Sequence, residues 1–336
     1  MPATPDTSTI LISTPFPVDS PMGNSVSARR IAGIARESGR RTEVIRGFAG
    51  QTGDALIALH AVKSATALAA FKAAHPDRPA ILILPGSDLY RDLPGGDESG
   101  FRSLALADRL AVAQEASLAD VPAAFREKCR VVPKSVDLPA GLVRNAPAPP
   151  HPAPFVARMF AHVRAQKDPL TAARAAALLP PDSPVRIEHF GAAAEPDLAA
   201  ALRAAGGGGR AYRLHDPVAR GEALRLLASA GVALNSSLME GGANAIAEAI
   251  ALGTPVVATA IPGNIGLLGP PIPPKRSIPG DAAALAALPA PCAEDRAFTD
   301  QLARQLSGSC DALHRRNRQR GRRCSGEDWR LDDPIA

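Results

Sequence analysis

Two acidic residues and a run of small residues mark the stretch of this chain best suited to chemistry. Glu240 and Glu248 stand eight residues apart. Small or polar residues follow the first of them: Gly241, Gly242, Ala243 and Asn244. The Ala-rich segment 243–252 is predicted to be a helix, so its first backbone N–H groups are uncovered, and together with the helix dipole they attract anions. Because a carboxylate further along can accept hydrogen bonds from sugar hydroxyls, the pattern suits a nucleotide-sugar diphosphate, although strand–helix–strand alone is compatible with any α/β protein.

Two basic residues could complete that site from a neighbouring strand. Arg164 and Lys167 stand three residues apart, after the predicted strand 155–160. Ligands of parallel α/β sheets bind beyond the carboxyl ends of the strands, where both side chains could reach a diphosphate. In isolation, solvated loop charges explain the two residues equally well. The anion site predicted after the strand 232–236 favours the binding interpretation.

Short apolar runs alternate with helical patterns along most of the chain, which indicates strands buried on both faces of a parallel sheet. The first half is predicted to have strands at 9–13, 42–46, 55–60, 80–84, 110–114 and 130–132, and helices at 25–39, 63–74 and 98–107. The second half is predicted to have strands at 155–160, 185–190, 210–214, 232–236 and 256–260, and helices at 169–179, 196–205, 217–229 and 243–252. The segment 261–269 carries several glycines and is expected to be a loop.

The first half carries candidate residues for a second substrate. Gly23 and Asn24 lie in the expected loop between the first strand and its helix, and His60 and Asp88 follow predicted strand ends. The loop lacks G-x-G-x-x-G spacing, so no dinucleotide site is indicated. A simple turn at Gly23 and a structural role for His60 are the alternatives that the sequence leaves open.

The length of the chain favours two domains, because 336 residues exceed the size at which one hydrophobic core usually stops growing. Six prolines fall between Pro139 and Pro154, and proline cannot continue a helix or a central strand. The predicted parts are a domain at 1–138, a linker at 139–154, a domain at 155–289 and a basic tail at 290–336. We expect an α/β fold of two Rossmann-like domains facing across a cleft, which is a favoured place for ligands.

Positive charge gathers near the end of the chain. The formal net charge is +5, and six arginines fall within nine residues: Arg315, Arg316, Arg318, Arg320, Arg322 and Arg323. Such a run could bind nucleic acid or an acidic membrane surface. No aromatic residues are interleaved with the arginines, so a solvated tail without a nucleic-acid partner is the preferred interpretation.

Cysteine usage and hydropathy bear on the location of the protein. Cys129, Cys292, Cys310 and Cys324 show neither a C-x-x-C pair nor ligand-like spacing to histidine, so reduced thiols and no metal site are expected. The N-terminal residues lack the pattern of an export signal. The chain also lacks a run of about 18 apolar residues, so no membrane span is expected. We expect a cytoplasmic protein.

The second half resembles a known family of enzymes. The E-x7-E spacing of Glu240 and Glu248, with Arg164 and Lys167 upstream, resembles the GT-B glycosyltransferases of the retaining, glycogen-synthase-like clan. The resemblance implies that the arginine and the lysine neutralise a donor diphosphate. It also implies that Glu240 lies near the donor sugar and that Glu248 holds the ribose. No cofactor and no metal are implied, because the two cations do what a divalent ion does in other transferases.

A narrower resemblance covers most of residues 8–289. The segments that carry it are GNSVSARRIAGIARESG, LIALHAVKSA, AAHPDRPAILILPGSDLYRDL, SLALADRLAVAQEA, HVRAQKDPL and MEGGANAIAEAIALGTPVVATAIPGNIGLLG. They resemble the SenB family, the selenosugar synthases of selenoneine biosynthesis, and MEGGAN followed by IPGNIGLLG is more specific than E-x7-E alone. The chain departs from the family pattern at Ser25, Ala161, Gln166 and Pro133–Lys134–Ser135.

This narrower resemblance implies a glycosyltransferase that forms a C–Se bond between selenophosphate and a UDP-sugar, either UDP-N-acetylglucosamine or UDP-glucose. The residues implied for catalysis are Arg164, Lys167, Glu240 and His60. Those implied for donor binding are Gly241, Gly242, Ala243, Asn244 and Glu248, and those implied for the acceptor side are Gly23, Asn24 and Asp88. Functional coupling to a selenophosphate synthetase and to a selenoneine-forming iron enzyme is also implied.

Two other functions remain open. An ordinary GT-B glycosyltransferase with a hydroxyl acceptor would use the same donor residues and would differ in the first domain. A non-catalytic GT-B fold could bind a nucleotide-sugar or a partner, and the departures at Ser25 and Ala161 favour it. Release of UDP with different acceptors separates the three functions.

Overall fold

The chain in the computed structural model is described at residues 8–139, 142, 154–206, 211–269, 276–277 and 279–287. Nearly all of the predicted linker 139–154 lies outside the described residues, and so does the whole predicted tail 290–336 with its arginine run. Cys129, the cysteine within the described part, is buried and forms no disulfide. No described helix is both long enough and apolar enough to cross a membrane.

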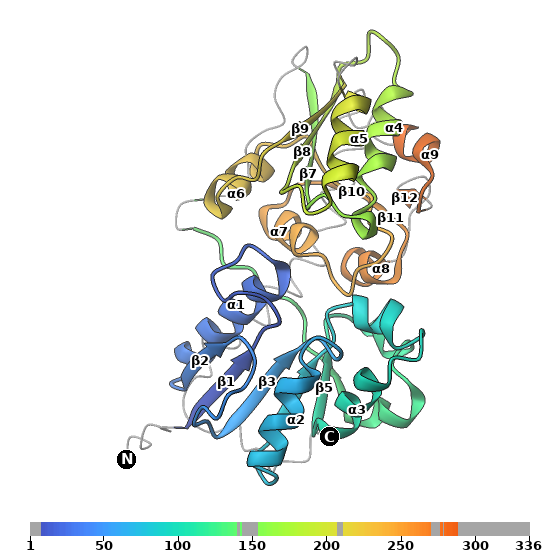
Figure 1. The fold of residues 1–336 in the computed structure, drawn as a ribbon. Coiled ribbons are helices and arrows are strands. Elements are labelled where there is room, and N and C mark those ends of the chain that lie inside the picture. Colours follow the sequence, from blue (N-terminus) through green and yellow to red (C-terminus); the bar gives the residue numbers. More distant parts are fainter. Residues whose placement is uncertain are drawn as a thin grey trace. The chain divides into compact units, whose positions relative to one another are not determined.

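The first sheet has six strands in the order β2-β1-β3-β4-β5-β6 (Figure 1). Its strands are β1 (Thr9–Ser13), β2 (Arg41–Ile45), β3 (Ala55–Leu59), β4 (Ala80–Ile83), β5 (Arg109–Val112) and β6 (Cys129–Val131). The helices between them are α1 (Gly23–Glu37), α2 (Ala65–Ala74) and α3 (Glu98–Leu106). The pairs from β2 across to β5 are parallel, as the apolar strand sequences predict.

Small residues on α1 explain how closely this helix packs on the first sheet. Ile12 of β1 and Leu59 of β3 form one buried cluster with Ala28 and Ala32 of α1. The two alanines lie one turn apart and so share one face of the helix. This face is apolar, as expected for a helix that covers a sheet.

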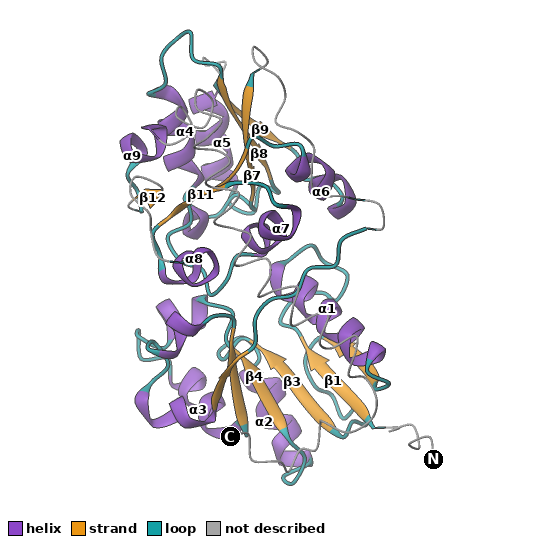
Figure 2. Ribbon diagram, turned by 180° about the vertical axis from the view of Figure 1, so that it is seen from behind, coloured by secondary structure: helices purple, strands orange, loops and turns teal. Residues whose placement is uncertain are grey.

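The second sheet also has six strands, in the order β12-β11-β10-β7-β8-β9, and every described pair is parallel. Its strands are β7 (Phe155–Phe160), β8 (Val185–Phe190), β9 (Tyr212–His215), β10 (Val232–Asn235), β11 (Val256–Thr259) and β12 (Arg276–Ser277). Its helices are α4 (Pro169–Ala177), α5 (Pro196–Gly206), α6 (Arg220–Ala228), α7 (Asn244–Leu252), α8 (Pro262–Leu268) and α9 (Ala282–Ala287). Helices flank both faces of this sheet (Figure 2).

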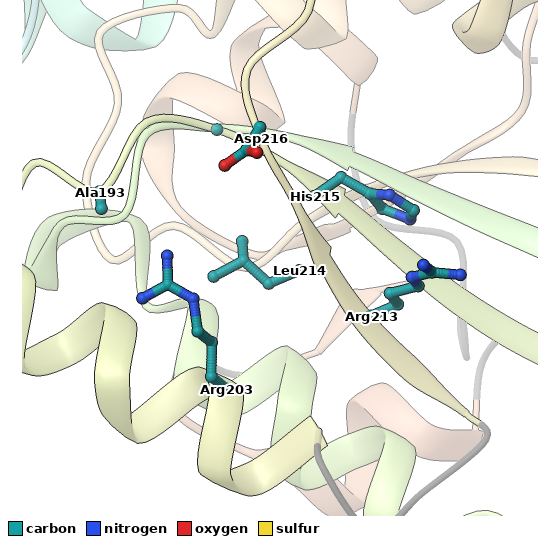
Figure 3. A pocket seen from close by; sticks show the side chains of 7 residues that line it. Ala193, Arg203, Arg213, Leu214, His215 and Asp216 are labelled. Atoms are coloured by element: carbon teal, nitrogen blue, oxygen red, sulfur yellow. The ribbon is translucent and has the colours of Figure 1, made fainter.

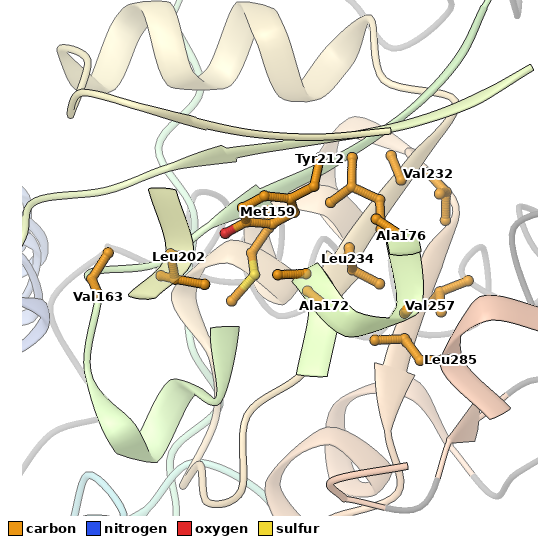
Figure 4. Packing of buried hydrophobic residues seen from close by; sticks show 14 of the residues in the cluster. Met159, Val163, Ala172, Ala176, Leu202, Tyr212, Val232, Leu234, Val257 and Leu285 are labelled. Atoms are coloured by element: carbon orange, nitrogen blue, oxygen red, sulfur yellow. The ribbon is translucent and has the colours of Figure 1, made fainter. Parts of the chain in front are cut away.

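The core of the second sheet lies on the face that α4 and α5 cover. Met159 of β7 and Leu234 of β10 pack there with Ala172 of α4 and Leu202 of α5 (Figure 4). Because successive residues of a strand point to opposite faces, Phe160 faces the other side, where α6 and α7 lie. Helices therefore cover both faces of the sheet, which explains why its strands β10 and β11 read as nearly continuous apolar runs.

Contacts within the chain divide it into two compact units that do not follow the chain order. Among the described residues, the first unit contains 8–83 and 96–111. The second unit contains 84–95 and the described residues from 112 onward. The turn that follows β4 therefore belongs to the second unit. The domain bounds drawn from composition stay a prediction.

The predicted fold class is confirmed, because the chain forms two parallel sheets flanked by helices. Two local expectations are wrong. The segment 261–269 is not a loop, since Pro262 begins α8 and Gly269 ends it with a φ of +79°; proline suits the first position of a helix, and glycine suits its end. Gly23 and Asn24 do not form a loop before the helix, since they are the first two residues of α1.

Candidate functional site

The loops that follow β7 and β10 meet at the carboxyl ends of these two neighbouring strands. Lys167 Nζ donates a short hydrogen bond to Glu240 Oε1, which makes this an ion pair between two residues that the sequence assigned to the site. The Ser237 hydroxyl donates to the same carboxylate oxygen at 2.8 Å. Both partners of the pair are half-buried or more. The carboxylate of Glu240 is therefore held in one orientation by two donors.

Backbone contacts fix the two loops to each other. Leu238 N donates to the Gln166 carbonyl at 2.9 Å. The buried Ser236 hydroxyl lies 3.0 Å from the Lys167 carbonyl oxygen and 2.9 Å from that of Asp168. Asp168 adopts a φ of +43° and caps α4 by accepting from Thr171 N. The loop that carries Lys167 is thus anchored at the end that leads into α4.

A buried polar network connects the loop after β10 to β11 and α8. The Asn264 amide of α8 donates to Asn235 Oδ1 at 3.1 Å and to the Thr259 carbonyl at 3.0 Å. The Thr259 hydroxyl donates to the Ser237 carbonyl at 2.6 Å. Asn264 and Thr259 are fully buried, and buried polar groups of this kind specify one local structure when they are hydrogen-bonded. The network places Ser237 where its hydroxyl reaches Glu240.

Arg164 precedes the short 3-10 turn Ala165–Lys167 and lies close to Glu195. Burial lowers the pKa of the Arg164 guanidinium, and the charge of Glu195 opposes that shift. The arginine stays protonated near pH 7, because the ordinary pKa of a guanidinium lies far above neutral pH. The structure therefore places a half-buried positive charge on the same loop as Lys167. Glu195 is an acidic neighbour of Arg164 that the sequence did not predict.

The start of α7 is an uncapped helix end. Ala243 occupies the capping position without a side-chain hydrogen bond, and the first turn contains no acidic residue. Lys134 Nζ donates to Asn244 Oδ1 at 3.1 Å, and its side chain passes over Gly242. Sequence reasoning missed Lys134, which stands 110 residues before its partner. A basic side chain and uncovered amides thus meet at the helix end that the sequence assigned to anion binding.

Glu248, the second glutamate of the predicted pair, lies on α7 and contacts an arginine that the sequence did not single out. Arg220, the first residue of α6, donates from Nε and Nη2 to Glu248 Oε1 at 3.3 and 3.2 Å. Its Nη2 also donates to the Asp137 carbonyl at 3.2 Å. Glu240 and Glu248 therefore have different basic partners.

Three glycines let backbone segments pass close to Glu240 within the second unit. A Cβ atom on Gly263 would overlap the carbonyl oxygen of Glu240, and one on Gly241 would overlap the carbonyl oxygen of Pro85. Gly241 N donates to that Pro85 oxygen at 3.2 Å. Gly86 has a φ of +133°, which side chains rarely allow. These positions need glycine for close approach.

The residues proposed for the acceptor side lie on separate elements of the chain. His60 follows β3 in the first unit, is buried, and adopts a φ of +85°. Asp88 belongs to the second unit and begins a π-helical turn, Asp88–Asp92, in which its carboxylate accepts from Gly86 N at 3.0 Å and Leu89 N at 2.9 Å. Gly23 and Asn24 begin α1 in the first unit. Asp88 thus has a structural role in its own turn.

A hollow of about 390 Å³ opens at the carboxyl ends of β8 and β9. Arg203 of α5 points to the side of β9 that carries Leu214, whereas Arg213 and His215 point to the other side (Figure 3). The His215 ring stacks on Phe190 at 4.5 Å, and burial lowers the pKa of His215. The volume falls in the range of small-molecule sites. In the sheet, β8 neighbours β7, the strand that leads to Lys167.

His189 stabilises this end of the second sheet from within its core. Its two ring nitrogens lie 2.8 Å from the Tyr212 hydroxyl and 2.8 Å from the Ala161 carbonyl oxygen. Burial lowers the pKa of His189 to about 4, against the raising effect of the hydrogen bond to Ala161. The ring is therefore neutral near pH 7, and it ties β8 to the residue that follows β7.

No group of three or more metal-ligating side chains occurs among the described residues. The positions at which the chain departs from the family pattern have identifiable contacts. The buried Ser25 hydroxyl donates to the Pro17 carbonyl at 2.9 Å. The carbonyl groups of Ala161 and Gln166 accept the bonds from His189 and Leu238.

Comparison with known proteins gives a family match and a fold. Residues 153–287 match a family model described as glycosyl transferases group 1. The matched region contains Arg164, Lys167, Glu240 and Glu248. Among curated protein sequences, none matches this chain.

Solved structures of glycosyltransferases are similar to the chain over nearly its whole length. Anabaena HepE in complex with UDP-glucose shares 19% sequence identity with a TM-score of 0.73, covering 94% of this chain and 98% of that one. Sucrose-phosphate synthase from Thermosynechococcus elongatus shares 16% identity with a TM-score of 0.74 and the same two coverages, 94% and 98%. A glycosyltransferase from Rickettsia africae shares 12% identity with a TM-score of 0.64, covering 96% and 100%. The chain has the GT-B fold, and the family match with this fold supports a glycosyltransferase.

Proposed function

We propose that this chain is a selenosugar synthase, which transfers the sugar of a UDP-sugar to the selenium of selenophosphate. The observation that carries the donor half is the Lys167–Glu240 pair beside the uncapped start of α7, within the region that matches glycosyl transferases group 1. The solved structure of HepE with UDP-glucose supports a UDP-sugar as the donor class. UDP-N-acetylglucosamine and UDP-glucose are the two candidate donors.

The charges of the site suit departure of UDP. The bond between the sugar C1 and the diphosphate oxygen breaks, and the electron pair leaves with UDP. Arg164, Lys167 and the amides at the start of α7 supply positive charge for the diphosphate oxygens. Fixed donors aimed at developing charge lower a barrier by roughly 3–4 kcal/mol each in comparable sites. Glu240, held by Lys167 and Ser237, accepts hydrogen bonds from the donor sugar.

Selenophosphate suits an acceptor site that lacks a strong base. Its selenium is a soft nucleophile that forms the C1–Se bond without first losing a proton, so little general-base help is needed. Hydrolysis of the remaining P–Se bond, with one water, gives phosphate and the selenosugar. Sequence resemblance supports this acceptor, above all the segments MEGGAN and IPGNIGLLG. Gly263 of the second segment packs on the Glu240 carbonyl of the first, so the two segments form one local structure.

Mass spectrometry of one reaction tests the function. The protein is incubated with each UDP-sugar and selenophosphate, and the products are searched for a hexose that carries the isotope pattern of selenium. Thiophosphate and inorganic phosphate serve as matched acceptors. We expect UDP release and a selenium-bearing sugar, with less product from thiophosphate and none from phosphate.

Other outcomes assign a different function. UDP release with hydroxyl acceptors but not with selenophosphate would make the chain an ordinary GT-B glycosyltransferase. Stabilisation by UDP-sugars without UDP release for any acceptor would make it a non-catalytic nucleotide-sugar-binding protein.

A further inference from the structure

The contact between α6 and α7 at Glu248 has features of a positioning device. Arg220 begins α6, Glu248 lies on α7, and the Asp137 carbonyl belongs to the segment that follows β6. The guanidinium contacts both of the others, so one side chain connects three separate parts of the second unit.

Both donors of Arg220 go to the same oxygen of the carboxylate. Nε lies 3.3 Å and Nη2 3.2 Å from Glu248 Oε1. A carboxylate offers about four acceptor positions on its two oxygens. An arginine whose two donors share one oxygen anchors that oxygen and leaves acceptor positions of the other oxygen for a ligand.

Exposure indicates that this pair contributes more to orientation than to stability. The Arg220 side chain is 42% exposed, whereas that of Glu248 is 15% exposed. Ion pairs with an exposed partner add little to the free energy of folding. A glutamate in a helix otherwise samples several rotamers. The planar guanidinium of Arg220 restricts these rotamers more than the ammonium of a lysine would.

We infer that Arg220 is a positioning residue for nucleotide recognition, which orients Glu248 toward the ribose hydroxyls of the donor. This inference rests on the proposed function, because it takes Glu248 as the acceptor for the ribose. Arg220 acts through Glu248 and does not touch the nucleotide. It therefore determines how strongly the site distinguishes a ribose from a 2′-deoxyribose.

A pair of nucleotides that differ by one hydroxyl tests the inference. UDP and 2′-deoxy-UDP are titrated by calorimetry into the wild-type chain and the Arg220→Gln variant. The wild-type chain should bind UDP at least tenfold more tightly than 2′-deoxy-UDP, because a hydroxyl bonded to a carboxylate is lost. In Arg220→Gln this ratio should fall to less than threefold, and measurable UDP binding shows that the variant is folded.

Arg225 provides the matched control on the same helix. It forms an exposed ion pair with Glu222, three residues before it. Arg225→Gln removes the same charge from α6 and should leave the UDP to 2′-deoxy-UDP ratio at the wild-type value. An equal fall in both variants would show a general charge effect and would overturn the inference.

A second variant distinguishes action through Glu248 from direct contact. Glu248→Gln should itself lower the ratio, and adding Arg220→Gln should lower it no further, because the two residues act as one unit. Additive effects would show that Arg220 contacts the nucleotide itself and would overturn the inference. A wild-type ratio near one would also overturn it while leaving UDP binding intact. A wild-type chain that binds no UDP would overturn the proposed function together with the inference.

Discussion

The loops after β7 and β10 differ from the segment after β1 in the side chains that pair there. After β7 and β10, charged side chains from adjacent loops pair with each other, as Lys167 and Glu240 do. After β1, neutral hydroxyls gather instead, with Thr14 Oγ1 and Ser25 Oγ 3.2 Å apart and both buried. Paired charges thus follow β7 and β10, whereas two buried hydroxyls follow β1.

We interpret this difference as a separation of the two halves of the proposed transfer reaction. A leaving diphosphate needs positive charge that is already in place, because reorganisation of charge during the reaction raises the barrier. The loops of the second sheet provide that charge and fix it by backbone contacts. The loop after β1 fixes its own conformation, because the hydroxyl of Ser25 donates to the Pro17 carbonyl. The following predictions test this contrast.

Removal of the two cations should have the largest effect. Arg164→Ala combined with Lys167→Ala should lower kcat/KM by roughly 10⁴-fold or more, since each oxyanion-type donor contributes about 10²–10³. Steady-state UDP release measures the effect. Arg174→Ala, an exposed arginine of α4, is the control and should stay near the wild-type rate. Near-normal turnover in the double variant would show that the charges after β7 do not assist the release of UDP.

Acid should weaken the second sheet through His189. The folded pKa of about 4 lies below the ordinary value of about 6.5, so between these pH values the unfolded chain binds more protons. Stability from this group is complete above about pH 6.5 and is lost as the pH falls toward 4, by up to roughly 3 kcal/mol. Urea unfolding at a series of pH values measures it. His189→Gln should flatten the dependence in this window, and an unchanged slope would exclude His189 as its source.

A methyl group at Gly263 should disturb the loop that holds Glu240. Gly263→Ala should reduce the free energy of unfolding by about 1–3 kcal/mol, because its Cβ would overlap the Glu240 carbonyl oxygen. Urea unfolding and UDP release measure the two effects. Gly221→Ala on α6 meets no atom within 4 Å and should raise stability by roughly 0.5–1 kcal/mol through helix propensity. Equal effects at both glycines would contradict the packing of α8 on the loop.

Loss of one hydroxyl should have the smallest effect. Ser237→Ala removes one of the two donors to Glu240 Oε1, and a hydrogen bond of this kind contributes about 1 kcal/mol. We expect kcat to fall roughly fivefold, with little change in stability. Ser236→Ala should instead lower the free energy of unfolding with little change in kcat, because the hydroxyl of Ser236 contacts backbone carbonyls of the Lys167 loop. The same changes in kcat and stability in both variants would show that both serines only support the loop.

Local patterns in the sequence predicted the strands β1 to β11 and most helices, but not β12. The runs 155–160 and 185–190 coincide with β7 and β8, since apolar residues recur in both runs between helical segments. The pattern failed at α8, where glycines at 263 and 266 suggested a loop. These glycines serve close packing: a Cβ on Gly263 would overlap Glu240, and one on Gly266 would overlap Gln114.

The sequence predicted those residues of the candidate site that directly follow strands. It did not predict the partners that contact them from distant parts of the chain. Sequence order placed Lys167 and Glu240 after two buried runs, and the sheet order made those runs neighbours. The partners Lys134 and Arg220 carry no local signal, since they lie 110 and 28 residues from the residues that they contact. Asp88 follows a strand as expected, yet its carboxylate accepts from the backbone of its own turn.

Calorimetric titration of UDP tests the central claim most directly, namely that the charged strand ends of the second sheet bind a nucleotide diphosphate. The wild-type chain should bind UDP in the micromolar range, and the Arg164→Ala/Lys167→Ala variant at least 100-fold more weakly, while uridine should bind both alike. Absence of UDP binding by the wild-type chain, or equal affinity in the double variant, would contradict the account.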